Sequence, residues 1–341
     1  MKIGIFSTNK HIAAALRKIF VDAPRFHISW LANSCRDVLE KLDKNSPELI
    51  IIDLDDTEGL IATKMIMHYK SHPILLVTSN MARMPGRVFE AMGYGAIDAV
   101  ELPYEPNSQI YHNVTGLFKK IETISNWIGP KSGFFTPVLK VRKELAKEKS
   151  TFPLLVIGAS SGGPLALATI ISQFPKNFNM AIVIIQHINE MFAAGLAKWL
   201  SSETSQCVEI VTGKSSLEPG KILMAGKNLH LIMNETLELN YIEEPMKTPY
   251  RPSINLFFKS VAENWPNKFV GLLLTGMGAD GVEGLKLLRS YGWHTITQSP
   301  SSCAVSGMPK AAIEADAVEE ILPLENIAER VLDHLERRKG R

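Results

Sequence analysis

The sequence predicts an α/β protein with two domains, each built on a mainly parallel β-sheet. Two series of short apolar runs alternate with amphipathic segments of a dozen or more residues. Alternation of this kind is typical of parallel sheets with helices on both faces. Between the two series, the chain loses its periodic pattern and carries many charges. We therefore expect domains at residues 1–127 and 152–341, joined by a linker at residues 128–151.

Composition and charge exclude several classes of protein. The 341 residues are 45% hydrophobic and 21% charged, with a formal net charge of +2. So small a charge favours neither nucleic acid nor an anionic membrane surface as a partner. No apolar run approaches the roughly 18 residues that insertion into a membrane requires. The cysteines, Cys35, Cys207 and Cys303, are odd in number and widely spaced, so we expect no disulfide framework, no metal site and a cytoplasmic location.

The first domain alternates strand and helix five times. The predicted strands are residues 3–6, 26–31, 49–52, 74–77 and 96–100. In parallel sheets, functional groups collect at the carboxyl ends of the strands. The residues that follow these strands are Ser7, Thr8, Asp53, Thr78 and Leu102.

Asp53, Thr78 and the segment 95–100 leading to Pro103 give the first domain a resemblance to the receiver domain of two-component response regulators. The resemblance implies a flavodoxin-like fold of five parallel strands. It also implies that Asp53 stands at the phosphoacceptor position and that a histidine kinase complex is a partner.

The first domain also departs from the receiver pattern. Receivers hold Mg²⁺ with an acidic pair after the first strand and carry a lysine before the proline, whereas this sequence has Ser7, Thr8 and Leu102 there. Phosphoryl transfer needs a divalent cation and a further positive charge, such as that of the lysine, to neutralise the oxygens of the transferring group. Two interpretations of Asp53 stay open: a working phosphoacceptor, which would require Mg²⁺, or a relic in a degenerate receiver that regulates by contact. We favour the second.

The second domain opens with an apolar run, residues 154–156, that ends in a glycine-rich turn around Ser160 and continues into an apolar helical pattern after Pro164. A hydroxyl in such a turn faces the free N–H groups of a helix N-terminus, which favours developing negative charge. Ser160 is therefore a candidate nucleophile. The alternatives are a phosphate-binding loop or a plain glycine-rich turn. The two common nucleotide-binding motifs, Gly-x-Gly-x-x-Gly and a loop that ends in Gly-Lys-Ser/Thr, are both missing from this turn.

The remaining strands of this domain are predicted at residues 180–185, 208–211, 222–224, 229–233, 237–241, 269–274, 295–297 and 318–321. Helices are predicted at residues 191–200, 254–262, 282–288, 309–315 and 327–335. Short runs between Pro-Gly and polar turns at residues 208–241 favour hairpins, so we expect part of this doubly wound domain to be antiparallel or at a sheet edge.

Three residues with complementary chemistry follow unbroken apolar strands. Ser160, His187 and Asp280 each stand at a carboxyl end, and parallel neighbouring strands would bring them together. Serine, imidazole and carboxylate form the constellation of nucleophile, general base and orienting acid. Separately, a histidine after a strand is more often structural, and Asp280 before Gly281 is also a helix-cap candidate.

Five ordered segments give the second domain a resemblance to the catalytic domain of chemotaxis protein-glutamate methylesterases. They are residues 157–164, 185–187, 251–254, 274–281 and 306–312. The resemblance implies that Ser160 is the nucleophile, His187 the general base and acid, and Asp280 the residue that orients the imidazole.

The same resemblance implies a reaction and a substrate. The reaction is hydrolysis of glutamyl methyl esters, with deamidation of certain glutamines, on methylated chemoreceptors or similar signalling proteins, without metal or cofactor. The active-site loop would comprise Ser161, Gly162, Gly163 and Met277, with backbone N–H groups near Ser161 and Met277 as oxyanion donors. The alternatives are a non-enzymatic signalling adaptor and a small-molecule carboxylesterase. The front domain is expected to regulate the second by covering the cleft at Ser160.

Overall fold

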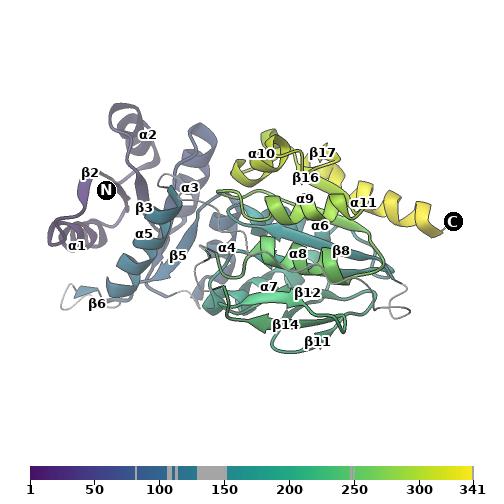
Figure 1. Cartoon of the computed structure of the whole chain (residues 1–341). Helices are drawn as coiled ribbons and strands as arrows, with labels where there is room; N and C mark the ends of the chain where they lie inside the picture. The colour runs from purple at the N-terminus through teal and green to yellow at the C-terminus, as the bar shows by residue number, and fades with distance from the viewer. Residues whose placement is uncertain are drawn as a thin grey trace.

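The computed structural model describes residues 1–80, 83–105, 110–111, 114–128, 152–245, 248 and 250–339. It contains two α/β domains that lie side by side (Figure 1). Apart from residue 128, the predicted linker at residues 128–151 lies outside the described residues. No helix among the described residues is long and apolar enough to cross a membrane.

The first domain is a five-stranded parallel sheet in the order β2-β1-β3-β4-β5. Its strands are β1 (Lys2–Phe6), β2 (His27–Ala32), β3 (Leu49–Asp53), β4 (Ile74–Thr78) and β5 (Asp98–Glu101). Its helices are α1 (Lys10–Val21), α2 (Cys35–Lys44), α3 (Thr57–Tyr69), α4 (Pro85–Gly93) and α5 (Val114–Ile128), and a short hairpin joins β6 (Tyr104–Glu105) to β7 (Ile110–Tyr111). This strand order is flavodoxin-like, as predicted.

The second domain is built on a seven-stranded, entirely parallel sheet in the order β10-β12-β9-β8-β15-β16-β17. Its strands are β8 (Leu154–Ala159), β9 (Ala181–Gln186), β10 (Val208–Val211), β12 (Ile222–Ala225), β15 (Val270–Leu273), β16 (His294–Gln298) and β17 (Glu320–Leu322). Its helices are α6 (Gly163–Ile171), α7 (Glu190–Thr204), α8 (Ile254–Asn264), α9 (Val282–Ser290), α10 (Gly307–Glu314) and α11 (Leu324–Lys339).

The chain builds this sheet outward in two directions. From β8 it proceeds to β9 and then to the edge formed by β12 and β10, and it later returns to place β15 on the other side of β8. The strand order therefore reverses between β8 and β15. Ligand sites in open α/β sheets lie at the carboxyl ends of the strands at such a reversal.

The antiparallel part of the second domain is a separate sheet. It consists of β11 (Ser215–Ser216), β14 (Glu238–Ile242) and β13 (His230–Met233). The expectation of hairpins was correct for β13 and β14, whereas β10 and β12 pair in parallel, with β10 at the sheet edge. All residues of β12 are buried, and a strand covered on both faces belongs inside a parallel sheet rather than in a half-exposed hairpin.

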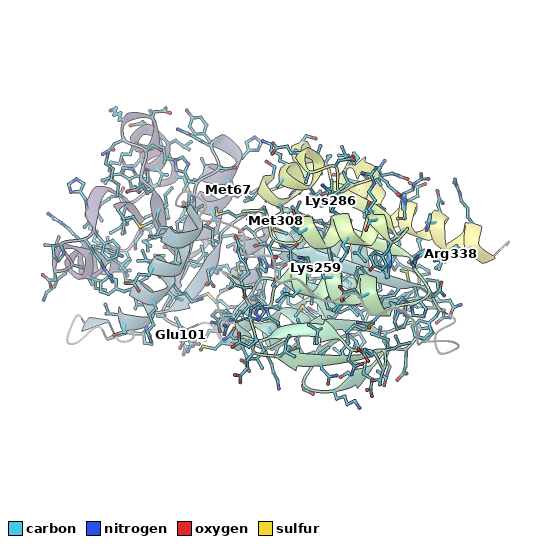
Figure 2. The ribbon with its side chains drawn as sticks, viewed as in Figure 1. Met67, Glu101, Lys259, Lys286, Met308 and Arg338 are labelled. Carbon is cyan, nitrogen blue, oxygen red and sulfur yellow. The ribbon has the colours of Figure 1, made fainter. Side chains whose placement is uncertain are left out.

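The two domains share a continuous apolar core. One cluster of buried side chains contains Phe89 and Met92 of α4 together with Leu167 of α6 and Leu196 of α7. The ring of Phe89 lies 6.1 Å from that of Trp199, centroid to centroid. Met67, which is labelled in Figure 2, packs against this cluster from the first domain. The first domain therefore docks through α4 against the helices that follow β8 and β9.

Candidate active site

Ser160 lies directly after β8, in the turn that leads into α6. Its backbone N–H donates to the carbonyl oxygen of Thr275, the second residue after β15, at 3.0 Å. The turn requires glycine at position 162, where φ is +82° and a Cβ would lie 2.6 Å from that of Ala304. Ser160 is therefore held between two central strands at the reversal point, and its residue surface is 7% exposed.

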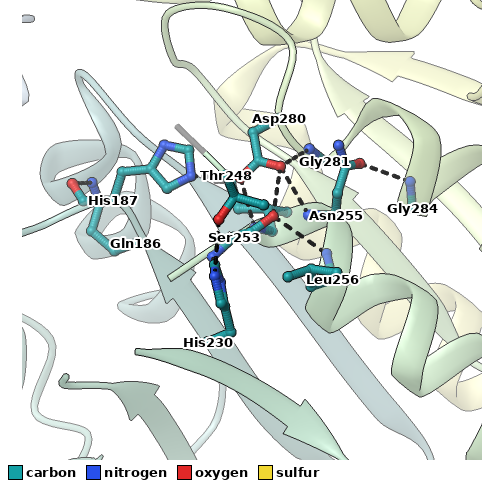
Figure 3. A network of polar contacts seen from close by, with 11 residues as sticks. Gln186, His187, His230, Thr248, Ser253, Asn255, Leu256, Asp280, Gly281 and Gly284 are labelled. Atoms are coloured by element: carbon teal, nitrogen blue, oxygen red, sulfur yellow. Dashed lines mark hydrogen bonds and ion pairs between the residues drawn. The ribbon is translucent and has the colours of Figure 1, made fainter. Parts of the chain in front are cut away.

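His187 and Asp280 meet beyond the carboxyl ends of β9 and β15, the two strands that flank β8. His187 follows β9, and its Nε2 atom lies 2.8 Å from Oδ2 of Asp280 in the loop after β15 (Figure 3). Both side chains are buried, at 6% and 4% exposure. An imidazole whose Nε2–H donates to a carboxylate keeps Nδ1 free to accept a proton. The structure thus brings together the imidazole and carboxylate that the sequence placed at strand ends.

The Asp280 carboxylate is surrounded by donors at the N-terminus of α8. Oδ2 accepts from the N–H of Ile254 at 2.7 Å, and Oδ1 accepts from the N–H of Asn255 at 3.1 Å and from Oγ of Ser253 at 3.0 Å. Burial acts to raise the pKa of Asp280, but the bond to His187 and these backbone N–H groups outweigh it and lower the pKa. Asp280 therefore stays ionised beside His187.

Ser160 and His187 are adjacent through their backbones but are not joined by a hydrogen bond. The N–H of His187 donates to the carbonyl of Ala159 at 3.0 Å, and Nε2 of Gln186 donates to the carbonyl of Ser160 at 2.9 Å. Among the described residues, Nδ1 of His187 is buried without a partner. The nitrogen that could accept a proton from Ser160 is thus unoccupied.

Some backbone N–H groups of the active-site loops are already hydrogen-bonded and others are not. The Gly163 N–H donates to the carbonyl of Ser160 and the Gly162 N–H to that of Met92, so neither is available. Within the described part of the chain, the N–H groups of Ser161 and Met277 donate to no protein acceptor. The oxyanion donors expected from the sequence lie near these two residues.

Three neighbouring residues were not assigned a role at the site from the sequence. The side chain of Ser253 donates a hydrogen bond to Asp280, and that of Gln186 donates one to the carbonyl of Ser160. The ring of Tyr250 stacks on that of His187. Ser253 is the N-cap of α8, since its Oγ accepts from the N–H of Leu256. Its second bond depends on a segment 27 residues away, which no local pattern reveals.

The other histidine near this corner is structural. His230 is fully buried, its Nδ1 accepts from the N–H of Ser253 at 3.2 Å, and burial lowers its pKa. It therefore stays neutral and supports the Ser253 backbone. A further histidine, His294, lies at the N-terminal end of β16, away from the site, within ion-pair distance of Glu319 and Glu320.

Asp53 lies apart from this site and is buried in the first domain. It is 3% exposed, Oδ2 accepts from Oγ of Ser7 at 2.8 Å, and burial raises its pKa to about 6. Leu102, at the position where receivers have lysine, is 1% exposed. Oδ1 of the nearby Asp55 accepts from Oγ1 of Thr78 at 2.6 Å. Nowhere in the described residues does a cationic side chain pair with Asp53.

The described residues contain no cluster of three or more histidine, cysteine, aspartate or glutamate side chains suited to a metal ion.

Comparisons with known proteins agree with the site geometry. The family model described as CheB methylesterase matches residues 155–331. The chain is similar to protein-glutamate methylesterase/protein-glutamine glutaminase 3 of Pseudomonas aeruginosa, with 39% identity over 336 residues that cover 98% of this chain and 99% of the relative. It is also similar to protein-glutamate methylesterase/protein-glutamine glutaminase 1 of Pseudomonas fluorescens, with 39% identity and coverage of 98% and 99%.

Among solved structures, the crystal structure of the Thermotoga maritima CheB methylesterase catalytic domain matches with a TM-score of 0.51 and 30% identity, covering 54% of this chain and 99% of that one. The likeness thus extends over almost the full length of the curated relatives and over the whole of the solved domain. The chain belongs to the CheB methylesterase family.

Proposed function

We propose that this protein hydrolyses glutamyl methyl esters, and deamidates certain glutamines, on a methylated chemoreceptor or a similar signalling protein. The observation that carries the proposal is the His187–Asp280 bond at the sheet reversal, directly beside the Ser160 turn. Family membership supports the reaction, because the relatives are named for both activities.

The residues present supply each step of an acyl transfer to water. Oγ of Ser160 attacks the ester carbonyl carbon while Nδ1 of His187 takes the hydroxyl proton, and Asp280 stabilises the resulting imidazolium. The N–H groups of Ser161 and Met277 stabilise the oxyanion, and losing one such donor typically costs about 3–4 kcal/mol of transition-state stabilisation. The imidazolium returns its proton to the leaving oxygen, so methanol departs and Ser160 is acylated.

The second half of the reaction repeats these roles with water. His187 removes a proton from a water molecule that attacks the acyl carbon, and this proton then passes to Oγ of Ser160 as its bond to the acyl carbon breaks. The glutamic acid product loses its remaining carboxyl proton to water. Deamidation differs only in its leaving group, which is ammonia. The present separation of Ser160 and His187 fits a resting state, since catalytic hydrogen bonds are often long until substrate binds.

The docked first domain supports a regulatory role. The N–H of Gly162 donates to the carbonyl of Met92 at the end of α4 at 2.9 Å, and the side chain of Met277 packs against the core of the first domain. Nζ of Lys120 lies over the ring of Phe192 at 5.1 Å. These contacts hold the loops that flank Ser160, so we propose that docking restrains the esterase and that undocking releases it.

The first domain regulates by contact rather than by phosphorylation in this proposal. Asp53 is closed off and has no cationic partner among the described residues, while phosphoryl transfer depends on positive charge. Incubation with acetyl phosphate and Mg²⁺ is expected to leave the intact mass unchanged. An adduct of about 80 Da that is absent from an Asp53→Ala variant would show a working phosphoacceptor instead.

Methanol release from a methylated chemoreceptor tests the enzymatic function. The wild-type chain is expected to release methanol and the Ser160→Ala variant to release none. The control variant Ser172→Ala, at the exposed C-cap of α6, should match wild type. Wild type without activity would favour the adaptor. Rapid turnover of soluble short-chain esters with no methanol from the receptor would favour the small-molecule esterase. A cytoplasmic location and a histidine kinase complex as partner belong to the same proposal.

A further inference from the structure

The ring of Tyr250 covers one face of the His187 imidazole. The two rings are 4.4 Å apart between centroids and tilted by only 5°, a nearly parallel stack. Tyr250 stands in the segment that leads to Ser253 and α8, whereas His187 follows β9, so two segments about sixty residues apart form this pair.

The phenol end of Tyr250 is seated over the loop that carries Asp280. At Gly278 a Cβ would lie 2.3 Å from the phenol oxygen, and φ there is +81°, so only glycine leaves room for it. Burial, followed by the nearby Asp280 charge, raises the pKa of Tyr250 to about 12. The ring is therefore neutral and wedged between His187 and the Met277–Asp280 loop.

The stack supplies a constraint that Asp280 cannot. A single hydrogen bond from Nε2 fixes where one edge of the imidazole lies, but leaves the ring free to turn about the bond. A flat ring at 4.4 Å fixes the plane. Together the two contacts determine where the unpartnered Nδ1 points, and that atom must take the proton from Ser160.

The same ring face also suits the charge that forms during the reaction. Once His187 has taken the proton, it is a cation lying over an aromatic face, and such contacts are favourable because the face of the ring carries negative potential. The stabilisation exists only after proton transfer, so it acts on the rate of the chemical step more than on substrate binding.

We propose that Tyr250 is a positioning residue for His187, which fixes the plane of the imidazole and stabilises its protonated form through the ring face. This inference rests on the proposed ester hydrolysis. It makes no use of the phenol hydroxyl, so phenylalanine should replace Tyr250, whereas an aliphatic side chain of similar volume should not.

Steady-state kinetics of the full-length protein test the role. Tyr250→Met and Tyr250→Leu are expected to lower kcat for methanol release about tenfold with little change in KM, and Tyr250→Phe to retain the wild-type kcat. Tyr69→Leu, at a half-exposed tyrosine of the first domain, is the matched control. Unchanged kcat in both aliphatic variants, or an equal loss in the phenylalanine variant, would overturn the proposal.

An NMR measurement on ¹³C-histidine-labelled protein keeps the stack testable without activity. The Cε1–H resonance of His187, assigned by its absence in His187→Gln, should lie upfield in wild type and Tyr250→Phe and move downfield in the aliphatic variants. The buried His230 resonance reports whether each variant is folded. A His187 resonance that does not move in a folded Tyr250→Met protein would contradict the stack. Wild type that shows the stack but releases no methanol would contradict the proposed function alone.

Discussion

At the scale of single residues, Asp280 is the most constrained group in the site. Its two oxygens accept from His187, Ser253, Ile254, Asn255 and the N–H of Gly281. The sequence predicted the pairing with His187, because both residues follow buried strands. It could not predict the other donors, since they come from the start of a helix that is distant in sequence.

Replacing Asp280 with asparagine should abolish most of the activity without unfolding the protein. The amide would reverse the donor at His187 and favour the wrong tautomer, and comparable changes in other serine hydrolases lower kcat about 10⁴-fold. Methanol release measures the loss, and near-UV circular dichroism checks the fold. A folded Asp280→Asn protein that keeps a tenth of wild-type activity would show that Asp280 does not orient His187.

Asp53 predicts a pH dependence of stability in the first domain. Its folded-state pKa of about 6 lies above the unfolded value of about 3.9, so the folded state binds the proton more tightly. The contribution of Asp53 to the free energy of unfolding is therefore largest at low pH and is lost as the pH rises through the folded-state pKa. The loss amounts to about 2 kcal/mol from pH 4.5 to pH 7.5. Hydrogen exchange of β3 should show this loss in wild type but not in Asp53→Asn. Equal pH dependence in both proteins would argue against a buried, neutralisable Asp53.

At the scale of elements, the sequence identified every strand of the two main sheets but not how all of them pair. Runs of four to six apolar residues became β8, β9 and β15 because strands covered on both faces must be apolar throughout. The sequence pattern of the runs that became β10 and β12 is equally typical of hairpin strands and of strands near the edge of a parallel sheet. Their pairing is decided by the neighbouring β9, which local patterns do not contain.

The N-terminus of α8 links helix stability to the site. Oγ of Ser253 caps the helix at the N–H of Leu256 and donates to Asp280. Ser253→Ala should therefore lower the free energy of unfolding by about 1 kcal/mol, which corresponds to a fall in Tm of about 2–4 °C. The same substitution should also reduce kcat. Ser290→Ala, at the exposed end of α9, serves as the control. A fall in Tm with full activity would restrict Ser253 to capping.

At the scale of the whole molecule, the face by which the domains dock was not predictable beyond the expectation that the front domain covers the cleft. Phe89 and Met92 of α4 have the pattern of ordinary core residues, and only the assembled structure shows them against α6 and α7. An apolar helix stripe predicts burial but does not identify what buries it.

Weakening this docking should activate the enzyme. Phe89→Ala removes the ring packed against Trp199, and a penalty of about 1.4 kcal/mol on the docked state already shifts its population tenfold. Because docking restrains the esterase in this account, methanol release should rise about tenfold. Val21→Ala, on an exposed side chain of α1, should leave the rate unchanged. A rate that stays at or below wild type in a folded Phe89→Ala protein would mean that docking does not restrain catalysis.

The central claim is that the Ser160 hydroxyl, at the sheet reversal beside the His187–Asp280 pair, forms the acyl-enzyme. An active-site-directed fluorophosphonate should react with one hydroxyl of the full-length protein, and peptide mass mapping should find the adduct on Ser160, with methanol release lost in proportion to labelling. Complete loss of activity with the adduct on another residue, and Ser160 unmodified, would contradict the account.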